Sequence, residues 1–321
     1  MNNTWALVLA AGEGSRLRSL TTTHSGVAVP KQFCSLRGGP SLLQEALRRA
    51  EAVAARQRIC TIVAADHRGW WERPLWSLPS QNVIVQPENR GTAPGLLFPL
   101  LHIAARDPHA NVVVLPSDHY VHDEAALARS LRRLRAHSEQ EPGRIFLLGI
   151  GPDEVDPELG YIVPAHGDGR GAFAVAQFAE KPSATLARAL IERGAMWNAF
   201  ILAGSAATLI AAFERRYPEI VMEMRGVVQH ERRTSCDGVA AADLYARLPE
   251  LDFSRHVLEG SEALLRVVPA PACGWSDLGT PKRVGEALRR LGADQDASGA
   301  SLASTAYLNL AAQHARLQLA V

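Results

Sequence analysis

The chain has 321 residues, with 34 lysine and arginine residues against 33 aspartate and glutamate residues, which gives a formal net charge of +1. This balance excludes a broadly basic protein that binds nucleic acid or a membrane surface through charge alone. A chain of this length buries about 75% of its unfolded surface, so it needs neither disulfides nor a structural metal to fold. Length alone allows two domains of about 150 residues or one large α/β domain.

The first half of the chain predicts strands and helices in alternation. Short runs of Val, Ile and Leu that are apolar at every position indicate strands covered on both faces. These runs are Trp5–Ala10, Ile59–Ala65, Val83–Val85 and Val112–Leu115. The helical patterns between them are Ser41–Ala55, Ala93–Ala105 and Glu124–His137. Such alternation predicts an open, doubly wound α/β sheet.

The second half is more mixed. Its expected strands are Ile145–Gly149, an antiparallel pair at Tyr161–Pro164 and Phe173–Phe178, and Leu264–Val268. Its expected helices are Ser183–Gly194, Ser205–Tyr217 and Pro281–Leu291. Residues 292–304 are small and polar and predict a linker, which is followed by a terminal helix over Leu302–Leu319.

Residues 194–213 carry no charge and are numerous enough to span a bilayer. Polar residues recur through the centre of this segment, so a strand at Trp197–Leu202, a turn at Ala203-Gly204 and a helix capped by Ser205 explain it better. The N-terminus has no basic stretch ahead of an apolar one, so no secretory signal is expected. Four cysteines without a Cys-x-x-Cys pair fit a reducing compartment, and we predict a cytoplasmic protein.

A glycine-rich turn follows the first predicted strand and reads Ala10-Ala11-Gly12-Glu13-Gly14-Ser15-Arg16-Leu17. Glycines in this position let backbone N–H groups approach a phosphate or a base edge. An ATPase phosphate loop is excluded because no Lys-Ser/Thr pair follows, and Leu17 stands where a dinucleotide fingerprint needs its third glycine. Two interpretations remain, a turn whose Arg16 is aimed at phosphates and an ordinary tight turn.

Carboxylates follow two of the later strands. Asp118 comes directly after Val112–Leu115, at the edge where open α/β sheets bind ligands. Asp277 offers a second carboxylate, and the two suit one Mg²⁺ ion over a substrate phosphate. A neighbouring cluster raises zinc as an alternative, but no further ligand is spaced nearby, so a surface cluster explains it better. This cluster comprises His119, His122 and Asp123.

Only three of the basic residues are lysine, and the other 31 are arginine. Lys31 and Lys181 lie in polar loop segments, where a compact ammonium suits a phosphate oxygen but a solvated loop residue is the simpler interpretation. Gln86 offers a donor and an acceptor to a base edge. Asn198 places an amide inside an apolar segment, where it needs polar partners.

Together and in this order, the polar segments resemble the sugar-1-phosphate nucleotidyltransferases, most closely their mannose-1-phosphate guanylyltransferase (GDP-mannose pyrophosphorylase) branch. The resemblance runs from about residue 5 to about residue 290. It is carried by LAAGEGSRL (9–17), PKQF (30–33), QPENRGTAP (86–94), LPSDH (115–119), EKP (180–182), WNAF (197–200) and GWSDLG (274–279). PKQF and NRGTAP favour the guanylyl branch over uridylyl or thymidylyl relatives. The chain departs from the family pattern after Gly279, where Thr280-Pro281 replaces Ser-Trp.

The resemblance implies a nucleotidyltransferase domain over residues 1–291, built on a Rossmann-like, doubly wound mixed sheet of the glycosyltransferase-A type. A nucleotide half would cover about residues 1–150 and a smaller sugar-phosphate lobe about residues 151–291, with a linker and helical tail over 292–321. The implied reaction transfers a nucleotidyl group from an NTP, GTP in this branch, to a hexose 1-phosphate, here mannose 1-phosphate. Its products are GDP-mannose and pyrophosphate, and its cofactor is Mg²⁺.

The resemblance also assigns residues to roles. Arg16 and Lys31 take the triphosphate, Asp118 and Asp277 hold Mg²⁺, and Lys181 fixes the sugar phosphate, which makes these five the catalytic set. The nucleotide-binding set is Ala10, Ala11, Gly12, Gly14, Ser15, Gln86, Asn89, Gly91 and Thr92. The sugar-phosphate set is Gly160, Glu180, Lys181 and Asn198.

Two alternatives stay open. One is a sister enzyme with another base or sugar, such as UTP or dTTP with glucose 1-phosphate. The other is a non-catalytic homologue that binds a nucleotide sugar and regulates a partner, although the intact catalytic set speaks against it. The residues leave the oligomeric state open, a homodimer included, and give Lys282 no role.

Overall fold

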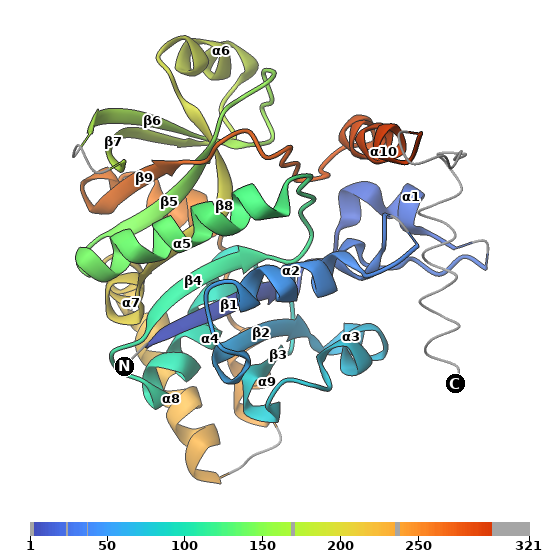
Figure 1. Ribbon diagram of the computed structural model, residues 1–321. Helices are drawn as coiled ribbons and strands as arrows, with labels where there is room; N and C mark the ends of the chain where they lie inside the picture. Colours follow the sequence, from blue (N-terminus) through green and yellow to red (C-terminus); the bar gives the residue numbers. More distant parts are fainter. Residues whose placement is uncertain (1–2, 24, 37, 168–170, 235–237, 297–321) are drawn as a thin grey trace.

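The computed structural model describes residues 3–296, apart from 24, 37, 168–170 and 235–237 (Figure 1). Within these residues the centre of the fold is a nine-stranded sheet in the order β3-β2-β1-β4-β8-β5-β9-β7-β6. The strands are β1 (Thr4–Ala10), β2 (Ile59–Ala64), β3 (Val83–Gln86), β4 (Asn111–Pro116), β5 (Ile145–Ile150), β6 (Gly160–Gly167), β7 (Phe173–Glu180), β8 (Met196–Ser205) and β9 (Leu265–Pro269).

The sheet is mixed, as expected. The first four strands pair in parallel, and β8 runs antiparallel between β4 and β5. β6 and β7 form the predicted antiparallel pair at one end of the sheet, beside α6. Because β1 and β4 are parallel neighbours, their carboxyl ends meet at one edge, and the loops that follow them lie close together.

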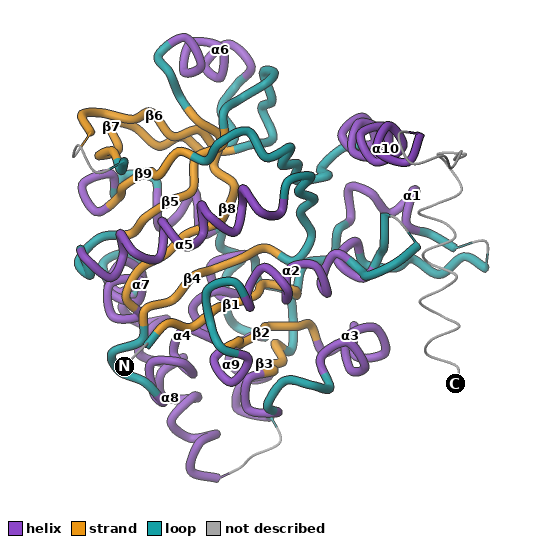
Figure 2. Tube along the Cα trace, viewed as in Figure 1, coloured by secondary structure: helices purple, strands orange, loops and turns teal. Residues whose placement is uncertain are grey.

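Helices cover both faces of the sheet (Figures 1 and 2). They are α1 (Arg18–Thr21), α2 (Leu42–Glu51), α3 (Arg68–Leu75), α4 (Thr92–Arg106), α5 (Glu124–Gln140), α6 (Ala184–Glu192), α7 (Ala206–Glu214), α8 (Pro218–Thr234), α9 (Val239–Tyr245) and α10 (Pro281–Asp296). Val8 of β1 packs in a core with α2 and α5, whereas its neighbour Leu7 packs in a second core with α4, α7 and α8. This opposite facing follows from the two-residue period of a strand.

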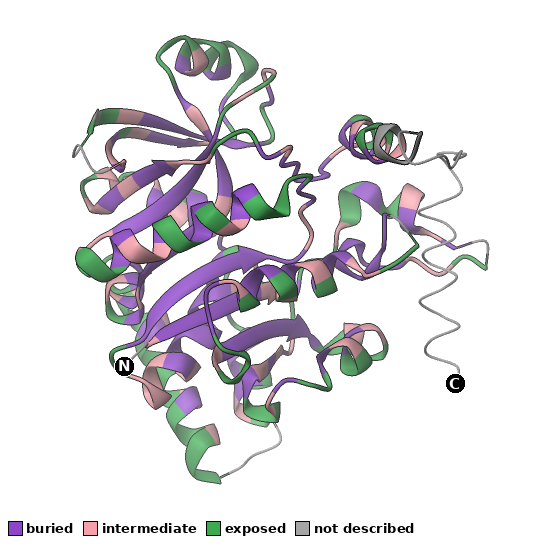
Figure 3. Cartoon of the chain, in the orientation of Figure 1, coloured by how far each residue is buried: buried purple, intermediate pink, exposed green. Residues whose placement is uncertain are grey.

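The central strands are buried along their whole length, while the outer sides of the helices are exposed (Figure 3). That pattern explains why β2, β4 and β5 have apolar runs without alternation, because both of their faces meet helices. It also confirms the expectation that these runs are strands of a doubly wound sheet.

One predicted turn is wrong. β8 continues through Ala203, which pairs with β5 on one side and β4 on the other, and through Gly204, which pairs with β4. Two strands that pair on both sides hold this stretch extended, so the small residues do not reverse the chain. The predicted cap is confirmed, because the Ser205 side chain accepts a hydrogen bond from Thr208 N at the start of α7.

Other helices differ from expectation. Helices α1, α3, α8 and α9 arise in stretches for which the sequence predicts no element, and α10 continues to Asp296 instead of ending at Leu291. The linker expected from residue 292 is therefore helical through residue 296, and the rest of the expected tail lies outside the described residues.

The charge-free segment 194–213 is divided between β8 and α7. Among the described residues, no helix has the length and apolarity that crossing a membrane requires.

A backbone contact joins the loop before α4 to the segment that follows α9. Ala93 N donates to Leu251 O at 2.9 Å, and Leu251 N donates to Arg90 O at 3.0 Å. Gly91 lies between them with a φ of 84°, and a Cβ at this position would lie 2.3 Å from Leu251 O. Only glycine combines this left-handed backbone with so close an approach.

We therefore expect Gly91→Ala to lower the free energy of unfolding by about 2–4 kcal/mol, because it adds both a left-handed backbone penalty and a clash with a backbone oxygen. Urea denaturation followed by circular dichroism measures this change. The matched control is Gly226→Ala on the exposed side of α8, where a Cβ meets nothing within 4 Å and helix propensity favours alanine. Equal stabilities for the two variants would contradict the prediction.

Candidate active site

A pocket of about 420 Å³ opens at the carboxyl ends of β1 and β4. This size is within the range of small-molecule sites. Most of the residues predicted for the site line it, from segments far apart in the chain. They are Ala11, Gly12, Gly14, Arg16, Gln86, Asn89, Gly91, Thr92, Asp118, Gly160, Glu180, Lys181, Asn198 and Asp277.

Three predicted residues do not line this pocket. Ala10 is buried at the end of β1, and its carbonyl oxygen accepts a hydrogen bond from Gln32 Nε2. Ser15 instead lines a separate, smaller cavity together with Arg18 and His67. Lys31 is buried beneath the pocket wall, so the interpretation of this lysine as a solvated loop residue is wrong.

The Pro-Lys-Gln-Phe segment (30–33) supports the glycine-rich turn through hydrogen bonds and close packing. Gln32 Nε2 donates to the carbonyl oxygens of Ala10 at 3.0 Å and Gly12 at 2.8 Å. Gly14 has a φ of 62°, and a Cβ at this position would lie 2.8 Å from Lys31 Cβ. The turn therefore needs glycine for close packing against this segment as well as for its backbone conformation.

Lys31 joins three motifs at one point. It lies in a short 3₁₀ turn, Lys31–Phe33, and is only 6% exposed. Its Nζ donates to Asp118 Oδ2 at 2.8 Å and also to the backbone carbonyl oxygen of Asp277. A buried ammonium needs such polar partners, so this contact fixes the two aspartate loops relative to the glycine-rich turn.

The electrostatics keep Asp118 ionised. Burial by itself would raise the pKa of this carboxyl group, but the charge and hydrogen bond of Lys31, together with His119 at the low pH where that ring is protonated, outweigh burial and hold the pKa at about 2. Burial lowers the pKa of the neighbouring His119 to about 4, against the opposing influence of Asp118. His119 is therefore neutral near pH 7, and its Nδ1 lies 3.3 Å from the Trp275 Nε1 donor.

Asp277 is more deeply buried, and its side chain meets two arginines. Its Oδ1 accepts a hydrogen bond from Arg283 Nη1 at 3.1 Å, and its Oδ2 lies 3.8 Å from Arg16 Nη2. A Cβ on Gly279 would lie 2.2 Å from Asp277 Oδ2, so the carboxylate folds over a position that only glycine leaves open. The side chain is thereby confined to one orientation beside the pocket.

These donors fit a magnesium ion better than a metal enclosed by protein ligands. Asp118 and Asp277 both line the pocket and offer carboxylate oxygens, the ligand type that Mg²⁺ prefers. The described part of the chain contains no group of three or more His, Cys, Asp or Glu side chains placed to hold a metal. Two carboxylates completed by substrate phosphates and water is the usual arrangement for Mg²⁺, whereas zinc needs a fuller set of protein ligands.

The opposite side of the pocket carries the residues predicted to read a sugar phosphate. A Cβ on Gly160 would lie 2.5 Å from Glu180 Oε2 and 3.2 Å from Asn198 Cβ, so these three positions are in contact. Asn198 has the polar partners that its apolar segment required, because Nδ2 donates to Ser254 Oγ at 3.3 Å and Oδ1 accepts from Phe200 N at 3.1 Å.

Backbone strain is concentrated at this pocket. Among the described residues other than glycine, positive φ angles occur at Lys181 (47°), Phe200 (55°) and Leu278 (49°). Lys181 and Phe200 line the pocket, and Leu278 follows Asp277 directly. Such conformations persist only where the surrounding structure enforces them, and they gather at functional sites.

Three lining residues escaped the sequence analysis, namely Glu250, Asp252 and Ser254. They lie in the segment between α9 and β9, for which the sequence predicted no element. Asp252 Oδ2 lies 3.3 Å from the Thr92 hydroxyl, which in turn accepts from Phe253 N at 2.7 Å. In the sequence these residues are marked only by two acidic side chains, Glu250 and Asp252, within an apolar stretch. Contacts with residues far away in the chain, such as Thr92, bring them to the site.

Comparison with known proteins agrees with this geometry. The family model described as nucleotidyl transferase matches residues 5–293. This chain belongs to the nucleotidyl transferase family. The match covers all the loops that build the pocket, so the predicted family resemblance is confirmed.

Among curated members of the family, the chain is 30% identical to the xanthan biosynthesis protein XanB of Xanthomonas campestris over 284 residues, which is 87% of this chain and 58% of that protein. It is also 30% identical to mannose-1-phosphate guanylyltransferase of Escherichia coli over 289 residues, 86% of this chain and 58% of that enzyme. The chain thus spans less than two thirds of the length of these relatives.

Solved structures show the same family fold. The crystal structure of mannose-1-phosphate geranyltransferase from Thermus thermophilus matches with a TM-score of 0.75 and 27% identity, over 89% of this chain and 79% of that one. A UDP-glucose pyrophosphorylase complexed with UDP-glucose matches with a TM-score of 0.58 at 14% identity, over 92% of this chain and 100% of that one, which supports the fold alone.

The Glu180 carboxyl group yields a prediction that does not depend on the reaction. Burial first, and the Asp252 carboxylate second, raise the pKa of Glu180 to about 7. Carbon-13 NMR should show this carboxyl group changing from protonated to ionised as the pH rises through about 7, with Glu180→Gln identifying the signal. Asp252→Asn removes a repelling charge and should move the midpoint to lower pH. Asp243→Asn, exposed on α9, is the control, and a midpoint that ignores Asp252 would contradict this account.

Proposed function

We propose that this protein transfers a nucleotidyl group from an NTP, preferably GTP, to a hexose 1-phosphate, preferably mannose 1-phosphate. The products are the nucleoside diphosphate sugar and pyrophosphate. The observation that carries this proposal is the contact of the buried Lys31 ammonium with both aspartate loops at the foot of the glycine-rich turn. It brings both aspartate loops to the turn that carries Arg16, so that this cation and the two carboxylates line one pocket, which is what joining two anionic substrates requires.

The reaction needs no covalent enzyme intermediate. A phosphate oxygen of the sugar 1-phosphate forms a bond to the α-phosphorus of the NTP, while the bond from that phosphorus to the β-phosphate oxygen breaks. The electron pair leaves with pyrophosphate, and no proton has to be removed because the nucleophile is already an anion. The protein's contribution is to align two anions and to stabilise the negative charge on the leaving group.

Each cation has a place in this scheme. Arg16, half-exposed at the pocket, binds the triphosphate and stabilises the departing pyrophosphate. Lys31 supports the same turn and holds Asp118 ionised. Lys181 binds the phosphate of the sugar, on the side of the pocket where Glu180 and Asn198 meet its hydroxyls.

Asp118 and Asp277 are the residues that would hold Mg²⁺, which when bound neutralises charge on the reacting phosphates. Their carboxylates come from the loop after β4 and from the loop before α10, at one wall of the pocket. Each carboxylate already has a cation beside it, Lys31 at Asp118 and the two arginines Arg283 and Arg16 at Asp277, and these cations limit the repulsion between the carboxylates.

The name of one relative supports guanine and mannose. Gln86 lines the pocket and would meet the base with its amide group, a contact that every nucleobase can make. The relative in Escherichia coli with 30% identity is named mannose-1-phosphate guanylyltransferase. The division into a nucleotide half and a sugar half, the cytoplasmic location and a homodimer stay predictions.

A panel of NTPs and sugar 1-phosphates, with pyrophosphate release as the readout, tests the proposal. GTP with mannose 1-phosphate should give the highest kcat/KM. A different best pair would identify a sister enzyme of the same family. No release with any pair would overturn the proposal and favour a non-catalytic homologue that binds nucleotide sugars.

Asp118→Ala should lower kcat by at least about 10³-fold, because it removes a carboxylate that would hold the metal over the reacting phosphates. Steady-state pyrophosphate release measures the effect, and circular dichroism checks that the variant is folded. Asp243→Asn serves as the control and should keep the wild-type rate. A wild-type rate in Asp118→Ala would contradict the assignment of Asp118 as a magnesium ligand.

Lys181→Ala should raise KM for the sugar 1-phosphate about 10–100-fold and leave KM for the NTP near its wild-type value, since a charged hydrogen bond to the sugar phosphate contributes about 1.5–3 kcal/mol. Both constants are obtained by varying one substrate at saturating levels of the other. Arg289→Ala is the control, because this exposed arginine on α10 forms its ion pair with Glu286, at 4.0 Å. An unchanged dependence on sugar 1-phosphate would refute the role of Lys181.

A further inference from the structure

The first turn of α10 carries an arginine that binds neither substrate in the proposed mechanism. Thr280 and Pro281 stand where the family pattern has Ser-Trp. They form a favourable helix start, with a hydroxyl cap followed by proline. Thr280 Oγ1 accepts from Arg283 N at 3.3 Å, and Thr280 O accepts from Val284 N at 3.1 Å. This start directs the Arg283 side chain back toward Asp277.

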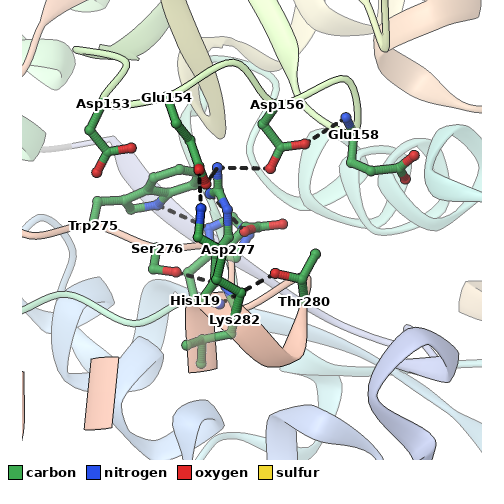
Figure 4. A network of polar contacts seen from close by, with 12 residues as sticks. His119, Asp153, Glu154, Asp156, Glu158, Trp275, Ser276, Asp277, Thr280 and Lys282 are labelled. Atoms are coloured by element: carbon green, nitrogen blue, oxygen red, sulfur yellow. Dashed lines mark hydrogen bonds and ion pairs between the residues drawn. The ribbon is translucent and has the colours of Figure 1, made fainter. Parts of the chain in front are cut away.

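The Arg283 guanidinium group contacts three carboxylates. Figure 4 shows the side chains that carry them, Glu154, Asp156 and Asp277, close together. Arg283 is 5% exposed. Nη1 donates to Asp277 Oδ1 at 3.1 Å, while Nη2 lies 2.8 Å from Asp156 Oδ2 and 3.7 Å from Glu154 Oε1. The group also lies 4.7 Å from the centre of the Trp197 ring, a cation–π distance.

Helix stability does not explain this placement. A cation in the first turn faces the positive end of the helix dipole, and burial of a guanidinium carries a desolvation cost. Both costs are offset only because the charge is shared among Asp277, Asp156 and Glu154. The position of Arg283 therefore has to be understood from what it does to these carboxylates.

Arg283 acts on two sides of the pocket. On the metal side, it binds Asp277 Oδ1 and leaves Oδ2 on the side of Arg16. On the sugar side, it binds Asp156, whose other oxygen accepts from Glu158 N at 2.8 Å. The residues that follow, Glu158, Leu159 and Gly160, line the pocket.

We propose that Arg283 is a positioning residue that fixes the Asp277 carboxylate and the 154–158 loop relative to each other, so that one guanidinium sets both the metal side and the sugar side of the pocket. This inference rests on the proposed nucleotidyl transfer. Partners that orient a metal-binding carboxylate typically change metal affinity 10–100-fold when they are removed. A role limited to anchoring α10 would change stability without changing metal affinity.

The experiment uses the full chain and three variants. Arg283→Met removes the charge at similar length, Arg283→Lys keeps a charge that cannot bridge two carboxylates, and Asp156→Asn weakens only the sugar-side contact. Arg289→Met is the matched control, an exposed arginine on the same helix whose nearest ion pair is with Glu286 at 4.0 Å. Mn²⁺ affinity is measured by electron paramagnetic resonance in the presence of a GTP analogue with a methylene bridge between the α- and β-phosphates. Thermal unfolding and both KM values are recorded for every variant.

Arg283→Met and Arg283→Lys should both weaken Mn²⁺ binding about 10–100-fold and raise KM for the sugar 1-phosphate. Asp156→Asn should raise that KM while Mn²⁺ affinity stays within about twofold of wild type. The control should match wild type in all measurements. Because Arg283→Lys and Asp156→Asn keep most of the buried contacts, they test the proposal even where Arg283→Met fails to fold.

Two results would overturn the proposal, and they differ from each other. Mn²⁺ affinity within twofold of wild type in Arg283→Lys, with only a lower unfolding temperature, would make Arg283 an anchor of α10. A wild-type protein that releases no pyrophosphate and binds no Mn²⁺ with the analogue would instead refute the nucleotidyl transfer itself, and the role of Arg283 with it.

Discussion

The ammonium group of Lys31 is buried at the meeting point of the glycine-rich turn, the loop after β4 and the loop before α10. A buried charge is tolerated only where polar groups surround it, and Asp118 and the carbonyl oxygen of Asp277 supply those groups. If any one of the three segments moved, the ammonium would lose a partner in a place that water does not reach. The geometry of the pocket therefore depends on this contact more than on any single contact with a substrate.

Local placement of charge explains how a chain of net charge +1 could bind the strongly anionic substrates that we propose for it. Arg16, Lys31 and Arg283 each meet an aspartate at the pocket wall, so cations and carboxylates fix one another before a ligand arrives. Preorganised charge of this kind needs no rearrangement during the reaction, which is the condition for effective electrostatic stabilisation. A broadly basic surface would attract phosphates without aligning them.

The backbone around the pocket is strained at several positions. Lys181, Phe200 and Leu278 adopt left-handed conformations, and Gly91 and Gly279 occupy positions where a Cβ would meet an oxygen. The surrounding sheet and its two cores supply the stability that holds such strain. The rigid sheet thus holds the loops that form the pocket in place.

The sequence by itself determined the alternation of strands and helices, the mixed sheet and most of the pocket residues, because apolar runs and polar loop motifs report local structure. It did not reveal that Lys31 is buried, that Ala203 and Gly204 stay in a strand, that Asp252 lines the pocket, or that Arg283 contacts Asp277. Each of these depends on contacts between residues far apart in the chain. Only the tertiary structure could decide them, since burial and pairing across the sheet leave no periodic signal in the segment itself.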